Sequence, residues 1–128
     1  MNIDPFGPDA TLHHVGLVVA SISAVAPDNE IFFDPIQKVK VSFISIQGMP
    51  VELIEPQGEE SPVMQSLRKG TKLVHFCYEV DNLKAAIELC TQDGFRYIAK
   101  PVPAVAFNQR HIAWVFHRVF GLFELLER

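Results

Sequence analysis

The chain has 128 residues, of which 48% are hydrophobic and 20% are charged, and its net charge is −4. This length and composition are typical of one globular domain with a core of its own. The acidic balance and the lack of a basic stripe argue against nucleic acid as a partner. No apolar run has the length that crossing a membrane requires, so we expect no membrane partner.

The two cysteines and the N-terminal residues indicate a cytoplasmic protein. Cys77 and Cys90 have no metal-clip spacing, so we expect two reduced, buried thiols. Residues 1–11 contain Pro5, Gly7 and Pro8 and no apolar run. We therefore predict a loose, turn-rich leader and no signal peptide.

The first half predicts four strands and very little helix. The expected strands are residues 12–20, 30–34, 38–46 and 51–54. Residues 21–26 allow one helical turn before Pro27, and Gln47-Gly48 predicts a tight turn. A polar linker, residues 57–70, follows, in which Ser61 is the expected N-cap of a short helix, 63–68, that ends at Gly70.

The second half predicts the order βαβββ. The expected elements are a strand at 73–80, a helix at 83–92, and strands at 95–99, 111–118 and 121–126. Asp81 or Asn82 would cap the helix and Gly94 would close it, while residues 101–110 are expected to form an irregular loop. The first half reads as a degenerate copy with an eroded helix. We thus predict an α+β fold, a single domain over residues 1–128 with modules at about 12–56 and 71–128.

Alternation along the two leading strands separates a polar face from an apolar face. In the strand at 73–80, His75 and Cys77 share one face, and Tyr78 and Val80 lie on the other. In the strand at 12–20, His14 and Gly16 share a face opposite an apolar stripe of Val15, Leu17 and Val19. His13 points away from His14 in this pattern, so we interpret it as structural.

Four polar residues interrupt apolar strands: His14, Glu52, His75 and Glu124. Each half contributes one histidine from its first strand and one glutamate from its last. An ionised glutamate is expensive to bury unless it is paired or metal-bound. Two imidazoles and two carboxylates suit one divalent ion of Zn, Ni, Co, Mn or Fe. His111 and His117 share a face, and either line the site or are exposed.

Three stretches resemble the vicinal oxygen chelate superfamily, which includes glyoxalase I, methylmalonyl-CoA epimerase and bleomycin-resistance proteins. They are HHVGLVV at 13–19, VELIEPQGEESP at 51–62 and VHFCYEVD at 74–81, and the strand at 121–126 fits the family's closing segment. The resemblance covers most of the chain from residue 12 and is nearest to the epimerase and glyoxalase-like branch.

The resemblance implies two βαβββ modules whose curled mixed sheets form a metal-binding cup. By position, His14, Glu52, His75 and Glu124 would be the ligands. The implied function is a metal-dependent lyase or isomerase that transfers a proton next to the carbonyl of a small, oxygen-chelating substrate, with Glu124 and Glu52 as catalytic carboxylates. The weaker candidates for lining the substrate site are Phe107, Arg110, Trp114 and His117.

The sequence departs from the epimerase pattern in two places and leaves other functions open. Residues 106–111 replace a glycine-rich loop, and the acidic residue that epimerases place ahead of the third strand has no clear equivalent near Gln37, so an acyl-CoA substrate and a second base are not implied. One alternative is a metal-free small-molecule (antibiotic-type) binding protein that uses Phe32, Phe33 and Trp114. Another is a structural or regulatory protein. The eroded helix would leave an apolar surface, from which we predict a homodimer.

Overall fold

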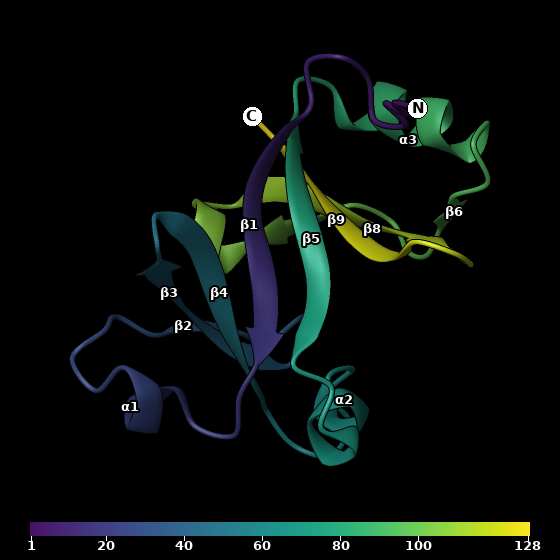
Figure 1. The fold of residues 1–128 in the computed structure, drawn as a ribbon. Coiled ribbons are helices and arrows are strands. Elements are labelled where there is room, and N and C mark those ends of the chain that lie inside the picture. Colours follow the sequence, from purple (N-terminus) through teal and green to yellow (C-terminus); the bar gives the residue numbers. More distant parts are fainter. The chain divides into compact units, whose positions relative to one another are not determined.

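A computed structural model describes residues 1–128 as a mostly β structure with few helices (Figure 1). The first half contains β1 (Thr11–Val18), α1 (Ile22–Val25), β2 (Phe32–Asp34), β3 (Val39–Ile46), β4 (Met49–Pro56) and α2 (Met64–Lys69). The second contains β5 (Leu73–Val80), α3 (Leu83–Thr91), β6 (Arg96–Tyr97), β7 (Val102–Ala104), a 3-10 turn η1 (Val105–Phe107), β8 (Arg110–His117) and β9 (Gly121–Glu127). The predicted α+β class is confirmed. None of the helices has the length and apolar character that crossing a membrane requires.

The chain forms two compact units. The His14 unit comprises residues 14–74 and 105–108, and the His75 unit comprises residues 1–13, 75–104 and 109–128. The N-terminal residues therefore belong to the unit that holds most of the second half, and residues 71–74 and η1 belong to the unit that holds most of the first half.

The His14 unit has the order βαβββ. Strand β1 pairs in parallel with β4, and β3 lies antiparallel between β4 and β2. The predicted tight turn joins β3 to β4, with Gln47 at φ 51° and Gly48 at φ 82°. The eroded helix is confirmed, because α1 has only four residues, begun by the Ser21 side chain accepting from Ala24 N–H.

The apolar stripe of β1 packs as alternation predicts. Val15 and Leu17 join Val51 and Leu53 of β4 and the fully buried Ile22 of α1. The opposite face of the same strands carries His14 and Glu52. The one-turn helix thus covers part of the apolar side, and the polar side is left for the site.

The His75 unit repeats this topology. Strand β5 pairs in parallel with β9, and β8 lies antiparallel to β9. Both β6 and β7 pair with β8, so they form one interrupted edge strand. The prediction of an irregular loop at residues 101–110 was wrong in part, because β7 and η1 lie within these residues. Pro103 is tolerated there because an edge strand needs no further N–H donor.

The core of the His75 unit lies between its sheet and α3. Leu83, Ala86 and Cys90 of the helix are buried against Val80, Ala113, Val115 and Leu125. The Asn82 side chain accepts a hydrogen bond from Ala85 N–H and caps the helix, as predicted. The face of β5 that carries Tyr78 and Val80 is therefore the apolar one.

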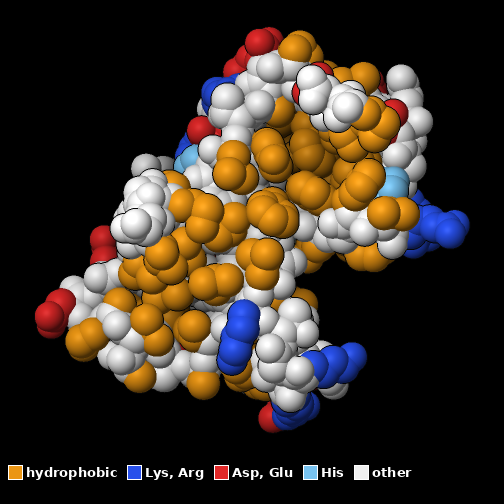
Figure 2. All heavy atoms as spheres, viewed as in Figure 1, with side chains coloured by type: hydrophobic (Ala, Val, Ile, Leu, Met, Phe, Trp, Pro, Cys, Tyr) orange, Lys and Arg blue, Asp and Glu red, His pale blue; other side chains and the backbone are white.

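The prediction of a loose leader was wrong. Phe6 is only 8% exposed, and its ring lies 5.2–5.6 Å from the rings of Tyr78, Phe95 and Phe123. Arg128 holds the same segment from the other end of the chain, because it donates to Asp9 C=O and to Thr11 Oγ1. Hydrophobic side chains also reach the surface on the face that Figure 2 shows.

The predicted cap of the linker helix was also wrong. Helix α2 begins at Met64 with Val63 at the N-cap position, and no side chain caps it. Ser61 belongs instead to the preceding turn, where its carbonyl accepts from Met64 N–H, and its Oγ is buried without a hydrogen-bond partner. The predicted end is confirmed, because Gly70 adopts the left-handed conformation at φ 76°.

Candidate functional site

The His14 unit brings His14 of β1 and Glu52 of β4 together. Gly16 is the direct partner of Glu52 in the parallel ladder, so the histidine two residues earlier shares a face with the glutamate. His14 Nε2 lies 3.7 Å from Glu52 Oε1, and both side chains are buried. These are two of the four predicted ligands.

Two aromatic rings fix the His14 imidazole. Phe43 of β3 is the ladder partner of Glu52, and its ring meets His14 edge-on with 5.8 Å between centroids. Phe107 of η1 stacks on His14 at 5.6 Å. Phe107, a predicted lining residue, is therefore in contact with one of the predicted ligands.

The His75 unit repeats the arrangement. Cys77 of β5 is the ladder partner of Glu124 of β9, and His75 stands two residues before it. His75 Nε2 lies 3.4 Å from Glu124 Oε1, and both side chains are buried. Trp114 of β8 is the partner of Glu124, and its ring meets His75 edge-on at 4.8 Å.

The donor set fits a divalent metal ion. Two ligand atoms at about 2.1 Å from one ion are separated by about 3.0–3.4 Å, depending on the coordination angle. The two histidine–glutamate separations of 3.7 and 3.4 Å approach these values and exceed the usual 2.9–3.0 Å of an N–H···O hydrogen bond. The residues able to hold such an ion are His14, Glu52, His75 and Glu124.

Arg110 and His117 have structural partners in the His75 unit. Arg110 Nη1 lies 3.0 Å from Glu79 Oε2 and also donates to Glu127 C=O. His117 Nδ1 accepts from the backbone N–H groups of Val119 and Phe120, and its ring packs on Phe95. By alternation His117 lies on the face of β8 opposite Trp114, so we leave it out of the proposed site.

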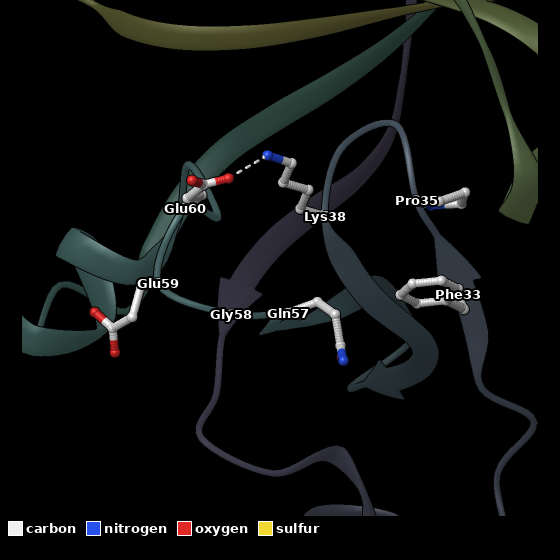
Figure 3. Close-up of a pocket in the computed structure, with 7 residues that line it drawn as sticks. All are labelled: Phe33, Pro35, Lys38, Gln57, Gly58, Glu59 and Glu60. Atoms are coloured by element: carbon white, nitrogen blue, oxygen red, sulfur yellow. Dashed lines mark hydrogen bonds and ion pairs between the residues drawn. The ribbon is translucent and has the colours of Figure 1, made fainter.

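Phe32 and Phe33, named for the metal-free alternative, point to different surroundings. Phe32 packs against the buried cluster of Val39, Val41 and Ile54. Phe33 instead lines a pocket of about 410 Å³, and the Lys38–Glu60 ion pair also lies in the wall of this pocket (Figure 3). Lys38 holds the pKa of the Glu60 carboxyl below its usual value.

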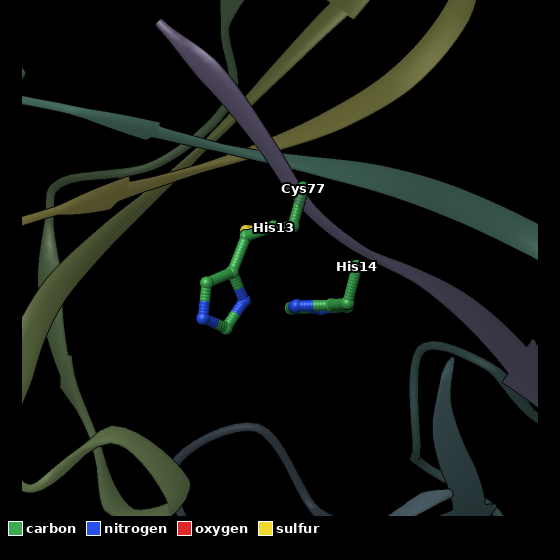
Figure 4. A group of neighbouring side chains, drawn as sticks. All are labelled: His13, His14 and Cys77. Atoms are coloured by element: carbon green, nitrogen blue, oxygen red, sulfur yellow. The ribbon is translucent and has the colours of Figure 1, made fainter. Parts of the chain in front are cut away.

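Reasoning from the sequence did not predict that Phe43 contacts His14. It also did not predict that His13 lies close to Cys77. Alternation had put Phe43 on one face of β3 without showing which partner that face meets. His13, interpreted as structural, has a ring nitrogen within 4.8 Å of Cys77 Sγ in the His75 unit (Figure 4). For His13 the available signal was its position next to the predicted ligand His14. For Phe43 it was the tight turn at Gln47-Gly48, which pairs Phe43 with Glu52.

Comparison with known proteins agrees with this architecture. Residues 13–114 match the model of the glyoxalase/bleomycin resistance protein/dioxygenase superfamily. An ethylmalonyl-CoA/methylmalonyl-CoA epimerase of Cereibacter sphaeroides is 27% identical over 125 residues, which cover 86% of this chain and 90% of that protein.

Solved structures show the same fold. The hypothetical protein BH1468 of Bacillus halodurans has a TM-score of 0.76 at 26% identity, and the match covers 94% of this chain and 95% of that one. Methylmalonyl-CoA epimerase of Mycobacterium tuberculosis has a TM-score of 0.77 at 18% identity, with 91% and 86% covered. The chain belongs to the glyoxalase/bleomycin resistance protein/dioxygenase superfamily.

Proposed function

We propose that His14, Glu52, His75 and Glu124 together hold one divalent metal ion and that the protein is an isomerase or lyase of the epimerase type. The observation that carries the proposal is the repeat of a buried histidine–glutamate pair at the same ladder position in both units. Burying two glutamates in a structural role alone would be unfavourable, because a buried carboxylate needs a compensating charge. The epimerase relative supports an isomerase reaction.

The proposed chemistry is proton transfer next to a carbonyl. A divalent ion in such a site supplies positive charge that stabilises a developing enolate and so acidifies the neighbouring C–H. Glu124, when it is partly released from the ion, would take that proton and return it to the enolate carbon, and Glu52 is the second catalytic carboxylate. Phe43, Phe107 and Trp114 hold the imidazoles in place and keep water away from them.

The proposed substrate is a small molecule with two oxygens that can chelate the ion. The name of the C. sphaeroides relative makes acyl-CoA thioesters the first substrates to test. Trp114, Phe107 and Arg110 remain our candidates for lining the substrate site. For Arg110, binding a substrate carboxylate would require it to give up its ion pair with Glu79.

Metal analysis and isotope exchange test the proposal. The protein loaded with Mn²⁺, which carboxylate ligands favour, should contain close to one ion per chain, and His75→Ala should lose it. Methylmalonyl-CoA incubated with the protein in D₂O should exchange its α-proton, and Glu124→Gln should abolish the exchange. The matched controls are His111→Ala and Glu88→Gln, because both residues are exposed and lie outside the proposed site.

Two outcomes would contradict the proposal. Unchanged Mn²⁺ content in His75→Ala would remove this residue from the site. A thermal midpoint that ignores chelators and divalent ions, but rises with an aromatic ligand, would instead support the metal-free binding protein. The aromatic rings against His14 and His75 are the observation that favours this second function.

A further inference from the structure

A second group of metal-binding side chains lies beside the proposed ligands. Cys77 of β5 is completely buried and forms no disulfide, and the half-buried His13 of β1 places a ring nitrogen within 4.8 Å of its Sγ. Figure 4 draws this pair with His14, the next residue of β1. A thiol and imidazoles are a different donor set from the two histidines and two glutamates of the proposed function.

The second donor set favours softer metal ions than the first. Thiolate ligands favour thiophilic ions such as Zn²⁺ and Cu⁺, whereas carboxylates favour harder ions such as Mn²⁺. Zinc sites with three protein ligands from cysteine and histidine keep a fourth position for water. A group of His13, His14 and Cys77 has the composition of such a site.

The His13 ring nitrogen and Cys77 Sγ lie close enough to bind one ion together after a small adjustment. A tetrahedral Zn²⁺ with Zn–N of about 2.05 Å and Zn–S of about 2.3 Å holds the two donor atoms about 3.6 Å apart. The separation between His13 and Cys77 is no more than 4.8 Å. Because His13 is not fully buried, a change of its side-chain torsion can bring the ring nitrogen from this separation to the distance that the zinc site requires.

We propose that His13 and Cys77, with His14 as the third donor, form a second metal site that binds a thiophilic ion, Zn²⁺ in the first instance. Neither His13 nor Cys77 is a ligand in the proposed function, so variants of these two residues test the second site without removing a ligand of the first. They share His14, so a thiophilic ion in the second site would compete with the ion of the first.

Cobalt provides the spectroscopic test, because Co²⁺ replaces Zn²⁺ and a cobalt–thiolate bond gives a charge-transfer band in the near ultraviolet. We expect Co²⁺ added to the metal-free protein to produce this band, and added Zn²⁺ to remove it. Cys77→Ser should reduce the band to background, and His13→Gln should weaken Co²⁺ binding at least tenfold. Glu124→Gln, which disables only the first site, should keep the band.

The chain offers a matched control for the thiol. Cys90 is also completely buried, but its Sγ donates to Ile87 C=O in α3. Cys90→Ser should therefore keep the band. Circular dichroism of each variant shows whether it is folded, and zinc X-ray absorption of the unmodified protein needs no variant. That spectrum should contain one sulfur ligand at about 2.3 Å. A band that persists in Cys77→Ser, no band in the unmodified protein, or a zinc spectrum without sulfur would overturn the second site.

Discussion

Phe43 and Trp114 hold the same position in the two units. Each is the ladder partner of a site glutamate, Phe43 of Glu52 and Trp114 of Glu124. Each also meets a site histidine edge-on, with interplanar angles of 80° for Phe43 and 89° for Trp114. The internal repeat therefore extends beyond the histidines and glutamates to the rings that orient them.

We predict that Trp114→Ala weakens binding of the proposed divalent ion on the order of tenfold, because the groups that orient a metal ligand contribute to affinity. Trp114→Phe should keep most of the affinity, since Phe43 already performs this role in the other unit. Competition with a chromogenic chelator measures the effect. Equal affinities for Trp114→Ala and the unmodified protein would contradict an orienting role.

The packing of Phe6 predicts that the N-terminal segment contributes to stability. Phe6→Ala should lower the free energy of unfolding by about 3 kcal/mol, because it empties a space between three aromatic rings. Phe33→Ala is the matched control, since Phe33 is 49% exposed and should change stability far less. Urea unfolding measures both. Similar losses for the two variants would show that the buried position of Phe6 has no special effect.

The sequence was sufficient wherever the pattern was local. Strand β5 has the predicted bounds, and alternation put Tyr78 and Val80 on the apolar face that the structure confirms. The register of the parallel pair β1–β4 is a non-local property, so the pairing of Gly16 with Glu52 could not be read from the chain. For the same reason Phe6 looked like part of a loose leader. Its partners lie about 70 to 120 positions further along the chain.

Asn82 should stabilise α3 through its side-chain cap. Asn82→Ala removes the acceptor for Ala85 N–H and should lower the free energy of unfolding by about 1 kcal/mol. Asn82→Asp keeps an acceptor oxygen and should be nearly neutral. Chemical denaturation distinguishes them. A loss in Asn82→Asp as large as that in Asn82→Ala would show that the cap is not the cause.

Burial raises the pKa of the Cys90 thiol to about 11 from an ordinary value of 9.0. Between these values the unfolded chain releases the thiol proton while the folded chain keeps it, so stability falls as pH rises. Two pKa units correspond to about 3 kcal/mol at most. Cys90→Ala removes this contribution, so its stability deficit relative to the unmodified protein should shrink between pH 9 and 11. Urea unfolding at pH 8 and 10.5 measures the deficit, and an unchanged value would exclude the thiol as its source.

The surface beside the eroded helix predicts a homodimer. Ile44 packs on the cluster that α1 covers, and Ile46, two residues further along β3, lies on the same face. Ile46 is 46% exposed, and its ladder partner Met49 is 41% exposed. Val25 at the end of α1 is 52% exposed as well. Four helical residues therefore leave apolar side chains in water, which a second copy of the chain would cover.

Ile46→Glu should shift the protein from dimer to monomer, because a dimer contact would bury the new carboxylate without a compensating charge. The control is Ile36→Glu, since Ile36 is also exposed but lies in the turn between β2 and β3. Light scattering across a concentration series measures the mass. A monomer at every concentration would contradict the dimer. A dimer that persists in Ile46→Glu would move the interface away from this surface.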